Sequence, residues 1–386
     1  MKILHIITGL NIGGAENMLA KLMEAEPHPD SQQVLSLLPR GPLAERIERT
    51  GVRVDCLDMG RGLATPAAAL RLRGYVRAAK PDILHGWMYH GNLAASFARL
   101  AVGRRVPTIW NVRHSLADPR REPAKTRALL ALSRPLSGTP DAIVYNSQAA
   151  ALQHEAYGFS AGRRQVVPNG FDCAQYCPDP KGRERLEALF RIPRDAVVIG
   201  CVARLHPMKG HDNLARAFAI ARQADARLHL LMVGRGLEEA PPELQALIGQ
   251  GGLTSSGARF DIAEWMPGLD VLAMPSGWGE GFPNVIGEAL LCGVPVVATD
   301  VGDSALVVGQ EGIVVPPQDP SALAAALVRI AAMPPEQRAI LGHSGRRRIE
   351  RLYAIDAIVR RYHDLYASIA GAKPYAGLSP ASASRS

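Results

Sequence analysis

The chain has 386 residues, of which 47% are hydrophobic and 21% charged, and it carries a net charge of +8 at pH 7. This composition excludes a disordered or fibrous protein, and the length exceeds what one hydrophobic core usually serves, so we predict two domains. The positive charge suits an anionic partner. Aromatic residues make up only 5% of the chain, and no nucleic-acid-binding motif accompanies the charge, so we expect no nucleic-acid partner.

The cysteines and the apolar runs bear on the location of the protein. The five cysteines, at 56, 173, 177, 201 and 292, are too few and too scattered for a disulfide scaffold, which fits a reducing cytoplasm. The first residues, MKILHIITGL, lack a secretory cleavage site and predict a buried strand. No uninterrupted run of about eighteen apolar residues follows, so we expect a cytoplasmic protein that does not span a membrane.

In chain order, short apolar runs alternate with longer helix-like stretches over the first 170 residues. The runs are KILHII, QVLSLL, VRVDCL, DILH, PTIWNV and AIVYNS. This alternation is typical of a parallel sheet with crossover helices. A segment rich in Pro, Asp and Gly, from Pro168 to Pro180, interrupts it, and we place the domain junction there.

The alternation then restarts with AVVIGCVA, LHLLMVG, LDVLAMPS and VPVVAT, and helical stretches follow from Pro320 onward. We therefore predict an α/β protein with two tandem Rossmann-like, doubly wound domains, residues 1–172 and 173–351, that face a shared cleft. We also predict that a C-terminal helix at about 352–370 packs back on the first domain. The tail, 371–386, has the composition of a disordered segment.

Ligands of such folds bind beyond the carboxyl ends of the strands, so the loops that follow strands are the informative ones. After the first strand, Gly13 and Gly14 precede a helix. Glycine permits close backbone approach, and the free amides of a helix start favour a phosphate. A Gly-Gly turn is also common for purely steric reasons, and the full GxGxxG dinucleotide fingerprint is absent.

The loop after the first strand of the second half, RLHPMKG, carries Arg204 and Lys209. A guanidinium and an ammonium group on one strand-to-helix loop would neutralise a diphosphate leaving group as charge develops on it. Two solvated surface cations are the alternative interpretation. No GxxxxGK[ST] motif accompanies them, which weighs against a phosphate-cleaving ATPase.

The stretch SGWGEGFPNVIGEALLCG is the densest candidate site. Glu280 lies in a Gly-rich turn, and Glu288 lies eight positions on, in a helix that we start near Pro283 or Asn284. One carboxylate can accept hydrogen bonds from sugar hydroxyls and the other from ribose hydroxyls, while the amides around Phe282 favour an anion at the helix start. The alternative is one helix-start carboxylate and one solvated carboxylate.

The combination of GGAE, PNGFD, RLHPMKG and EGFPNVIGE resembles the family 4 glycosyltransferases of GT-B architecture, in particular bacterial polysaccharide-assembly members. The resemblance runs from about Lys2 to Ala370, nearly the whole chain. It implies a transferase that takes a sugar from a nucleotide-sugar donor with retention of anomeric configuration. One departure is Leu306, at a position that many members fill with glutamate, and it leaves the donor site intact.

The resemblance also implies roles for matched residues. Glu280 would contact the donor sugar, Glu288 would hold the donor ribose, and Arg204 and Lys209 would bind the diphosphate. His114, in WNVRHS, matches the family histidine near the transferred sugar, and together with Glu280, Arg204 and Lys209 it forms the implied catalytic set. The implied donor-binding set comprises Gly13, Gly14, Arg204, Lys209, Arg259, Glu280, Gly281, Phe282, Pro283, Asn284 and Glu288.

Three histidines have structural alternatives to these roles. A histidine at a strand end, such as His114, is often a satisfied structural residue. His85 and His90, in LHGWMYHGNL, resemble a pattern in polysaccharide-assembly members that would face the acceptor. Ordinary helix-start and packing roles explain His85 and His90 as well.

No Asp-x-Asp occurs anywhere in the sequence, so the usual carboxylate pair that holds a divalent metal against a nucleotide sugar is absent. Protein cations would then stabilise the leaving group, and we expect neither a metal nor another cofactor. This agrees with the metal-independent chemistry of the resembled fold. No carboxylate is placed as a nucleophile, which disfavours a double displacement and favours same-face attack.

The partners follow from these predictions. We expect a nucleotide-sugar donor, a UDP-sugar by preference, and a glycan or lipid-linked acceptor in cell-surface polysaccharide synthesis. The basic stretches LRLRGYVRAAK and RREPAKTRALLALSR suit peripheral contact with the anionic cytoplasmic membrane face, although a solvated face of a core helix explains them equally well. The alternative functions are a nucleotide-sugar 2-epimerase of similar fold and an inactive nucleotide-sugar-binding homologue.

Overall fold

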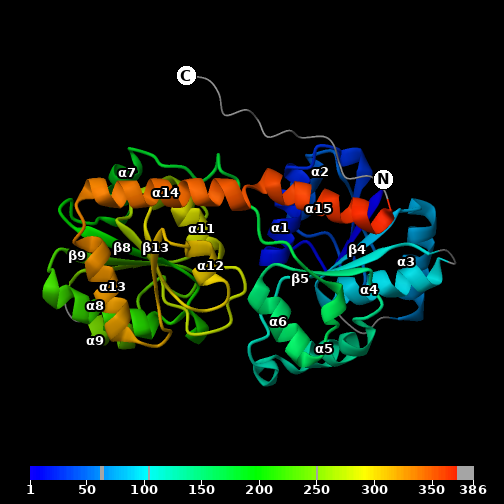
Figure 1. The fold of residues 1–386 in the computed structure, drawn as a ribbon, viewed down its shortest axis with the longest axis horizontal. Helices are drawn as coiled ribbons and strands as arrows, with labels where there is room; N and C mark the ends of the chain where they lie inside the picture. The colour runs from blue at the N-terminus through cyan, green and yellow to red at the C-terminus, as the bar shows by residue number, and fades with distance from the viewer. Residues whose placement is uncertain (61–64, 103–104, 249–250, 372–386) are drawn as a thin grey trace.

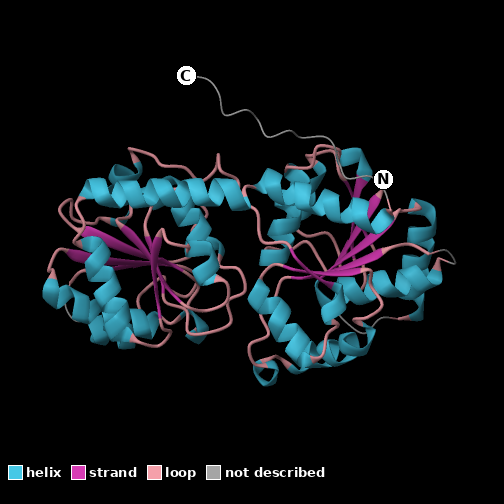
Figure 2. Cartoon of the chain, viewed as in Figure 1, coloured by secondary structure: helices cyan, strands magenta, loops and turns pink. Residues whose placement is uncertain are grey.

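The computed structural model describes residues 1–60, 65–102, 105–248 and 251–371. Two α/β domains lie side by side along the long axis of the molecule (Figure 1), and each has a parallel sheet between layers of helices (Figure 2). The predicted fold class, two tandem doubly wound domains, is therefore confirmed. The segment predicted to be disordered, 371–386, lies outside the described residues from 372 onward.

The first domain is built on a parallel sheet, which in the described ranges has seven strands in the order β3-β2-β1-β4-β5-β6-β7. The strands are β1 (Ile3–Ile7), β2 (Gln32–Ser36), β3 (Arg53–Cys56), β4 (Ile83–Trp87), β5 (Thr108–Val112), β6 (Ala142–Tyr145) and β7 (Arg164–Val166). The α-helices are α1 (Gly14–Glu24), α2 (Leu43–Glu48), α3 (Pro66–Ala79), α4 (Met88–Ala101), α5 (Ala124–Leu136) and α6 (Gln148–Tyr157). The central strands are buried along their whole length, which explains their nearly continuous apolar runs.

The second domain repeats this plan with a sheet of six described strands in the order β10-β9-β8-β11-β12-β13. The strands are β8 (Val197–Val202), β9 (Leu228–Val233), β10 (Leu253–Ser256), β11 (Val271–Met274), β12 (Val296–Thr299) and β13 (Gly312–Val315). The α-helices are α7 (Gly182–Phe190), α8 (His211–Ala224), α9 (Pro242–Ile248), α10 (Ile262–Trp265), α11 (Asn284–Leu291), α12 (Ser304–Val308), α13 (Pro320–Ala331) and α14 (Pro335–Tyr353). Short 3₁₀ turns span Pro29–Ser31, Pro119–Arg121, Ala161–Arg163, Pro207–Lys209 and Met266–Gly268.

Each sheet has a point at which the strand order reverses, between β1 and β4 in the first domain and between β8 and β11 in the second. In open parallel sheets, ligands bind beyond the carboxyl ends of the strands at such points. In the second domain, α8, α9 and α13 cover one face of the sheet, and α7, α10, α11 and α14 cover the other. The loops that leave β8 and β11 are therefore the ones positioned to form a site.

The chain passes between the domains twice (Figure 1). The second passage follows α14, after which α15 (Ile355–Ala370) packs on the first domain and buries Ile358, Val359, Tyr362 and Tyr366 in its core. The two passages lie against each other, since Phe171 N–H donates to the Tyr353 carbonyl and Ile355 N–H donates to the Phe171 carbonyl, both at 2.9 Å. A Cβ at Gly170 would lie 3.0 Å from Ile355 Cα, which shows how closely the two passages approach.

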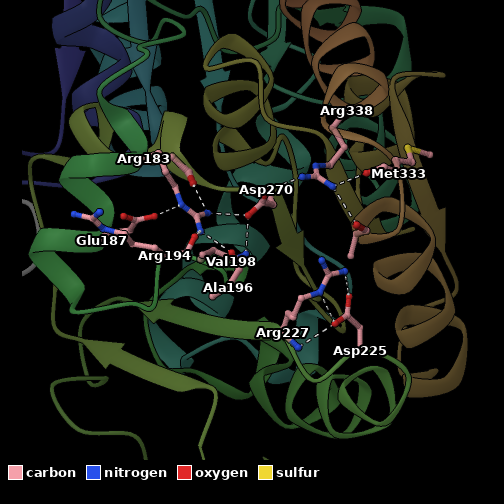
Figure 3. A network of polar contacts seen from close by, with 12 residues as sticks. Arg183, Glu187, Arg194, Ala196, Val198, Asp225, Arg227, Asp270, Met333 and Arg338 are labelled. Atoms are coloured by element: carbon pink, nitrogen blue, oxygen red, sulfur yellow. Dashed lines mark hydrogen bonds and ion pairs between the residues drawn. The ribbon is translucent and has the colours of Figure 1, made fainter.

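A polar network at the amino-terminal ends of β8 and β11 ties α7, α14 and the second sheet together (Figure 3). Asp270, just before β11, accepts hydrogen bonds at 2.9 Å from Arg183 of α7 and from Arg338 of α14, and at 2.8 Å from the Val198 amide of β8. A carboxylate shared by two guanidinium groups is a charge-assisted contact stronger than a neutral one. This network leaves the carboxyl ends of β8 and β11 free for function.

Candidate functional site

A cavity of about 380 Å³ lies between the two domains. The start of α1 contributes Gly13 and Gly14, and α11 contributes Asn284 and Glu288. The structure therefore brings together four residues that the sequence singled out from positions about 270 apart. Further lining residues that sequence reasoning missed are Lys21, Arg46, Asn169, Gln175 and Tyr176.

Glu288 is held in this cavity by the junction segment and by α1. Burial raises the pKa of Glu288, while the charge of Lys21 and a hydrogen bond from the Tyr176 hydroxyl act in the opposite direction. Tyr176 belongs to the Pro-rich junction, where the sequence offered no periodic signal. Lys21 and Tyr176 therefore offset only part of the desolvation of the Glu288 carboxylate, and its oxygens can accept further hydrogen bonds.

Because the folded protein holds Glu288 with a raised pKa, the stabilisation from its neutral form is complete at low pH and is lost as the pH rises through the folded-state pKa. We therefore expect Glu288→Gln to melt a few degrees above the wild-type protein at pH 7 and to lose this advantage near pH 4, where the wild-type carboxyl is protonated as well. Differential scanning fluorimetry at both pH values measures this. The exposed Glu239→Gln is the matched control, and an advantage of equal size at both pH values would contradict the assignment.

Glu280 and Lys209 meet directly at the neighbouring loops. Glu280 is 9% exposed, and its Oε1 accepts hydrogen bonds from Lys209 Nζ and Ser276 Oγ, both at 2.6 Å. Their approach depends on Gly210, which has a left-handed φ of 64° and where a Cβ would lie 2.1 Å from the Pro275 carbonyl oxygen. Two residues 71 positions apart thus form one charged pair.

Arg204, on the same loop as Lys209, is exposed and forms no hydrogen bond or ion pair within the described part of the chain. Lys209 is already engaged by Glu280, whereas the guanidinium of Arg204 is available to an anion. Arg259 differs, because its guanidinium pairs with Asp261 and lies 5.7 Å from the centre of the Phe190 ring. Arg259 is not among the residues that line the interdomain cavity.

The turn after Glu280 abuts the first domain. A Cβ at Gly281 would lie 3.3 Å from Ser147 Oγ, which shows how closely this turn approaches the loop after β6. The carboxylate of Asp303 accepts hydrogen bonds from the Gln148 and Ala149 amides, at 2.8 and 2.9 Å, and so caps α6 from the other domain. Sequence reasoning missed Asp303, since a cap supplied by another domain leaves no local spacing.

Phe282 and Pro283 are buried and pack inside the protein. The Phe282 ring is buried against Phe171 and Tyr353, with ring centres 6.0 and 5.3 Å apart, so only its backbone is available to a ligand. Pro283 is buried and precedes the first residue of α11. A Cβ at Gly287 would lie 2.2 Å from Phe171 Cζ, which shows how closely α11 packs on the junction.

The three histidines that the sequence singled out have different surroundings. His114 is partly buried, and its Nε2 lies 3.0 Å from Glu122 Oε1, a partner that sequence reasoning missed. His90 is exposed on the first turn of α4. His85 lies inside the first domain at 0% exposure, with its ring nitrogens 2.8 Å from the Tyr366 hydroxyl and 3.2 Å from Asn111 Nδ2.

His85 therefore does not face an acceptor, contrary to the acceptor-side hypothesis. Burial lowers its pKa well below the ordinary value, which keeps the ring neutral at neutral pH. The covering element is α15, which supplies Tyr366 from 281 positions further along the chain. Its role is that of a hydrogen-bonded core residue.

A series of side-chain hydrogen bonds also connects the first domain to α11. Arg113 donates to the Tyr362 hydroxyl at 3.2 Å and to Asn169 Oδ1, and Asn169 Nδ2 donates to Asn284 Oδ1 at 2.5 Å. Asn169 and Asn284 both line the interdomain cavity. The start of α11 is therefore tied to the first domain through Asn284, which the sequence singled out, and through Arg113 and Asn169, which it did not.

Within the described ranges, no group of three or more His, Cys, Asp or Glu side chains is arranged to hold a metal ion. Likewise, none of the described helices combines the length and the apolar character needed to cross a membrane.

Two facing Rossmann-like domains with a charged cleft between them define the GT-B class of fold. Residues 196–333 match the family "Glycosyl transferases group 1", and residues 13–170 match the "Glycosyl transferase 4-like domain". The D-inositol 3-phosphate glycosyltransferase of Salinispora tropica is 30% identical over 340 residues, which cover 80% of this chain and 68% of that relative. The chain therefore belongs to the family of group 1 glycosyltransferases.

Solved structures support the fold at lower sequence identity. HepE of Anabaena, in complex with UDP and glucose, superposes with a TM-score of 0.81 at 22% identity and covers 95% of this chain and 100% of its own. The lipopolysaccharide outer core galactosyltransferase WaaB gives 0.69 at 18% identity and covers 95% and 99%. At these identities the similarity shows a shared fold.

Proposed function

We propose that this chain is a metal-independent, retaining hexosyltransferase that takes its sugar from a UDP-sugar. The observation that carries the proposal is the pairing of Lys209 with Glu280 beside Arg204, while Glu288 meets Gly13 and Gly14 across the cleft. A nucleotide sugar needs cations at its diphosphate and acceptors at its hydroxyls, and these groups supply both. The complexes of HepE with UDP and with UDP-glucose favour uridine as the base.

In the proposed mechanism the donor bridges the two domains. Arg204 and Lys209 hold the diphosphate, the α1 start offers amides to it, and Glu288 accepts hydrogen bonds from the ribose. When the diphosphate enters, Lys209 exchanges part of its contact with Glu280 for the phosphate. Glu280 is then free to accept hydrogen bonds from the sugar.

The contacts of Glu280 also favour same-face attack. Its Oε1 is held by Lys209 and Ser276 at 2.6 Å, which suits a hydroxyl acceptor and disfavours a nucleophile. The acceptor hydroxyl would attack from the side on which the diphosphate leaves, and the departing phosphate would take its proton. His114, held by Glu122, would lie beside the transferred sugar.

For the acceptor, we propose a glycan or lipid-linked glycan of cell-surface polysaccharide synthesis, to which the similarity with WaaB lends support. A phosphorylated inositol is a second candidate, because the Salinispora relative is a D-inositol 3-phosphate glycosyltransferase. The exposed Lys125, Arg127 and Leu132 of α5 support a separate proposal of peripheral contact with an anionic membrane face, which flotation with anionic vesicles would test.

The donor is tested with a panel of UDP-, GDP- and ADP-sugars. A ligand at about 100 times its Kd stabilises the folded state by about 2.7 kcal/mol, which corresponds to a rise of several degrees in melting temperature. We expect such a rise with a UDP-sugar and a smaller one with the other nucleotides. Incubation with acceptors, followed by NMR of the product, separates a glycoside with retained configuration from an epimerised nucleotide sugar, and no rise with any donor would contradict the proposal.

A further inference from the structure

Asn284, the first residue of α11, is exposed and lines the interdomain cavity. Its side-chain Oδ1 accepts a hydrogen bond from Asn169 Nδ2 at 2.5 Å. Its Nδ2 forms no hydrogen bond with any residue that the structure describes. One end of this amide is therefore fixed to the first domain, and the other end is available to a ligand in the cavity.

The orientation of the Asn169 amide decides which end of Asn284 is available. An amide donates through its nitrogen and accepts through its oxygen, so its hydrogen-bond partners determine which way it points. Asn169 Oδ1 accepts a hydrogen bond from Arg113 Nη2. Because a guanidinium group only donates, Asn169 turns its oxygen toward Arg113 and its nitrogen toward Asn284. Asn284 then turns its oxygen toward Asn169 and keeps its nitrogen free.

Arg113 is itself held in place from the core of the first domain. Its Nη1 donates to Asn111 Oδ1 at 3.3 Å and to the Tyr362 hydroxyl at 3.2 Å. Its guanidinium also lies 5.7 Å from the centre of the buried Trp87 ring, a distance at which a cation and an aromatic face attract each other. Tyr362 belongs to α15 and is 2% exposed. The direction of the hydrogen bonds is thus fixed at a rigid anchor.

The residue type at position 169 suits this direction. Within the described ranges Arg113 has no carboxylate partner, although a carboxylate at position 169 would pair with it more strongly than an amide does. A carboxylate could not donate to Asn284, whereas an amide accepts from Arg113 and donates to Asn284 at once. The amide therefore transmits the direction of the hydrogen bonds to α11.

The free nitrogen of Asn284 lies where an anion is favoured. Gly13 and Gly14, at the start of α1, line the same cavity, so the starts of α1 and α11 meet there from the two domains. Helix starts carry partial positive charge and favour phosphate groups. In the proposed function, the anion that enters this cavity is the diphosphate of the nucleotide sugar.

We propose that Asn284 Nδ2 donates a hydrogen bond to the diphosphate of the donor, and that Asn169, oriented by Arg113, is the positioning residue that keeps this nitrogen free to do so. The inference rests on the proposed function, because it adds a contact to the same donor. It also gives the core of the first domain a part in donor binding, since the series begins at Arg113 and ends at α11.

Asn169→Asp tests the proposal by reversing the orientation of Asn284. The new carboxylate accepts from both neighbours, so Asn284 turns its nitrogen toward it and its oxygen toward the diphosphate. We expect the affinity for UDP, measured by isothermal titration calorimetry, to fall about tenfold or more, because a hydrogen bond to a charged group is lost. The affinity for uridine, which lacks the diphosphate, should equal that of wild type. The melting temperature should not fall, because Arg113 gains a carboxylate partner.

Arg113→Met is the charge-matched comparison, because it lowers the net charge by one, as Asn169→Asp does. Asn169 can then adopt either orientation, and UDP selects the productive one. We expect the affinity for UDP to fall only about two- to threefold, in proportion to the fraction of protein in that orientation. The melting temperature should fall, because the acceptors around the guanidinium lose their donor. A purely structural role would instead make the less stable variant the weaker binder.

Three outcomes would count against the proposal. Wild-type affinity for UDP in Asn169→Asp would overturn the inference and leave the proposed function standing. Equal losses of UDP affinity in Asn169→Asp and Arg113→Met would also overturn it, since the change in net charge would then explain both. A wild-type protein that binds no UDP would overturn the proposed function and the inference with it.

Discussion

Lys209→Ala is expected to lower kcat for sugar transfer by about a thousandfold. Lys209 Nζ is the partly buried cation nearest to Glu280, and we propose that it faces the diphosphate as negative charge develops during bond cleavage. Removal of one preorganised group of this kind typically costs a factor of about 10² to 10³ in rate. Steady-state kinetics with a saturating UDP-sugar measures the effect.

The Lys209 side chain is 23% exposed and, among the residues that the structure describes, pairs with Glu280 alone, so the melting temperature of the variant should remain within a few degrees of wild type. Lys181→Ala, an exposed lysine of the same domain, serves as the control and should turn over normally. Turnover of Lys209→Ala at the wild-type rate would remove the proposed stabilisation of the leaving group.

Glu280→Gln is expected to lower kcat/KM for the donor by about a hundredfold. The substitution keeps the shape of the side chain but removes the charge that pairs with Lys209 and weakens acceptance of hydrogen bonds from sugar hydroxyls. A lost hydrogen bond between a charged group and the substrate is worth about 1.5 to 3 kcal/mol, which corresponds to this range. Kinetics with the donor sugar and with deoxy analogues measures the loss.

Ser276→Ala provides the contrast, because it removes the other donor to the same carboxylate oxygen and leaves the charge in place. We expect its kcat/KM to fall less than tenfold. An equal effect of the two substitutions would mean that the carboxylate acts through its loop and not through the sugar.

The two carboxylates of EGFPNVIGE thus differ in their surroundings. Glu280 is held by a lysine and a serine, whereas Glu288 lies in the interdomain cavity beside Tyr176 and Lys21. This arrangement does not resemble an acid and a base on either side of one glycosidic bond. It fits two hydrogen-bond acceptors for different parts of one donor.

Much of the fold could be predicted from the sequence, because in a parallel sheet covered on both faces the central strands must be apolar throughout. The runs KILHII and AVVIGCVA contain β1 and β8, and the loops that follow the strands contain candidate site residues. The glycine of RLHPMKG was also informative, since Gly210 marks a backbone approach that a Cβ would block.

The sequence by itself determined most of the strands, their parallel arrangement and the residue types at the strand ends, since these depend on local periodicity and turn chemistry. Only the tertiary structure decided which side chains are exposed and which distant ones meet. The sequence suggested an acceptor-side role for His85, but α15 covers this residue in the structure. The Phe282 side chain packs in the core against Phe171. The pairing of Lys209 with Glu280 and the cap of α6 by Asp303 likewise join elements far apart in the chain, because such contacts arise from packing that no local pattern encodes.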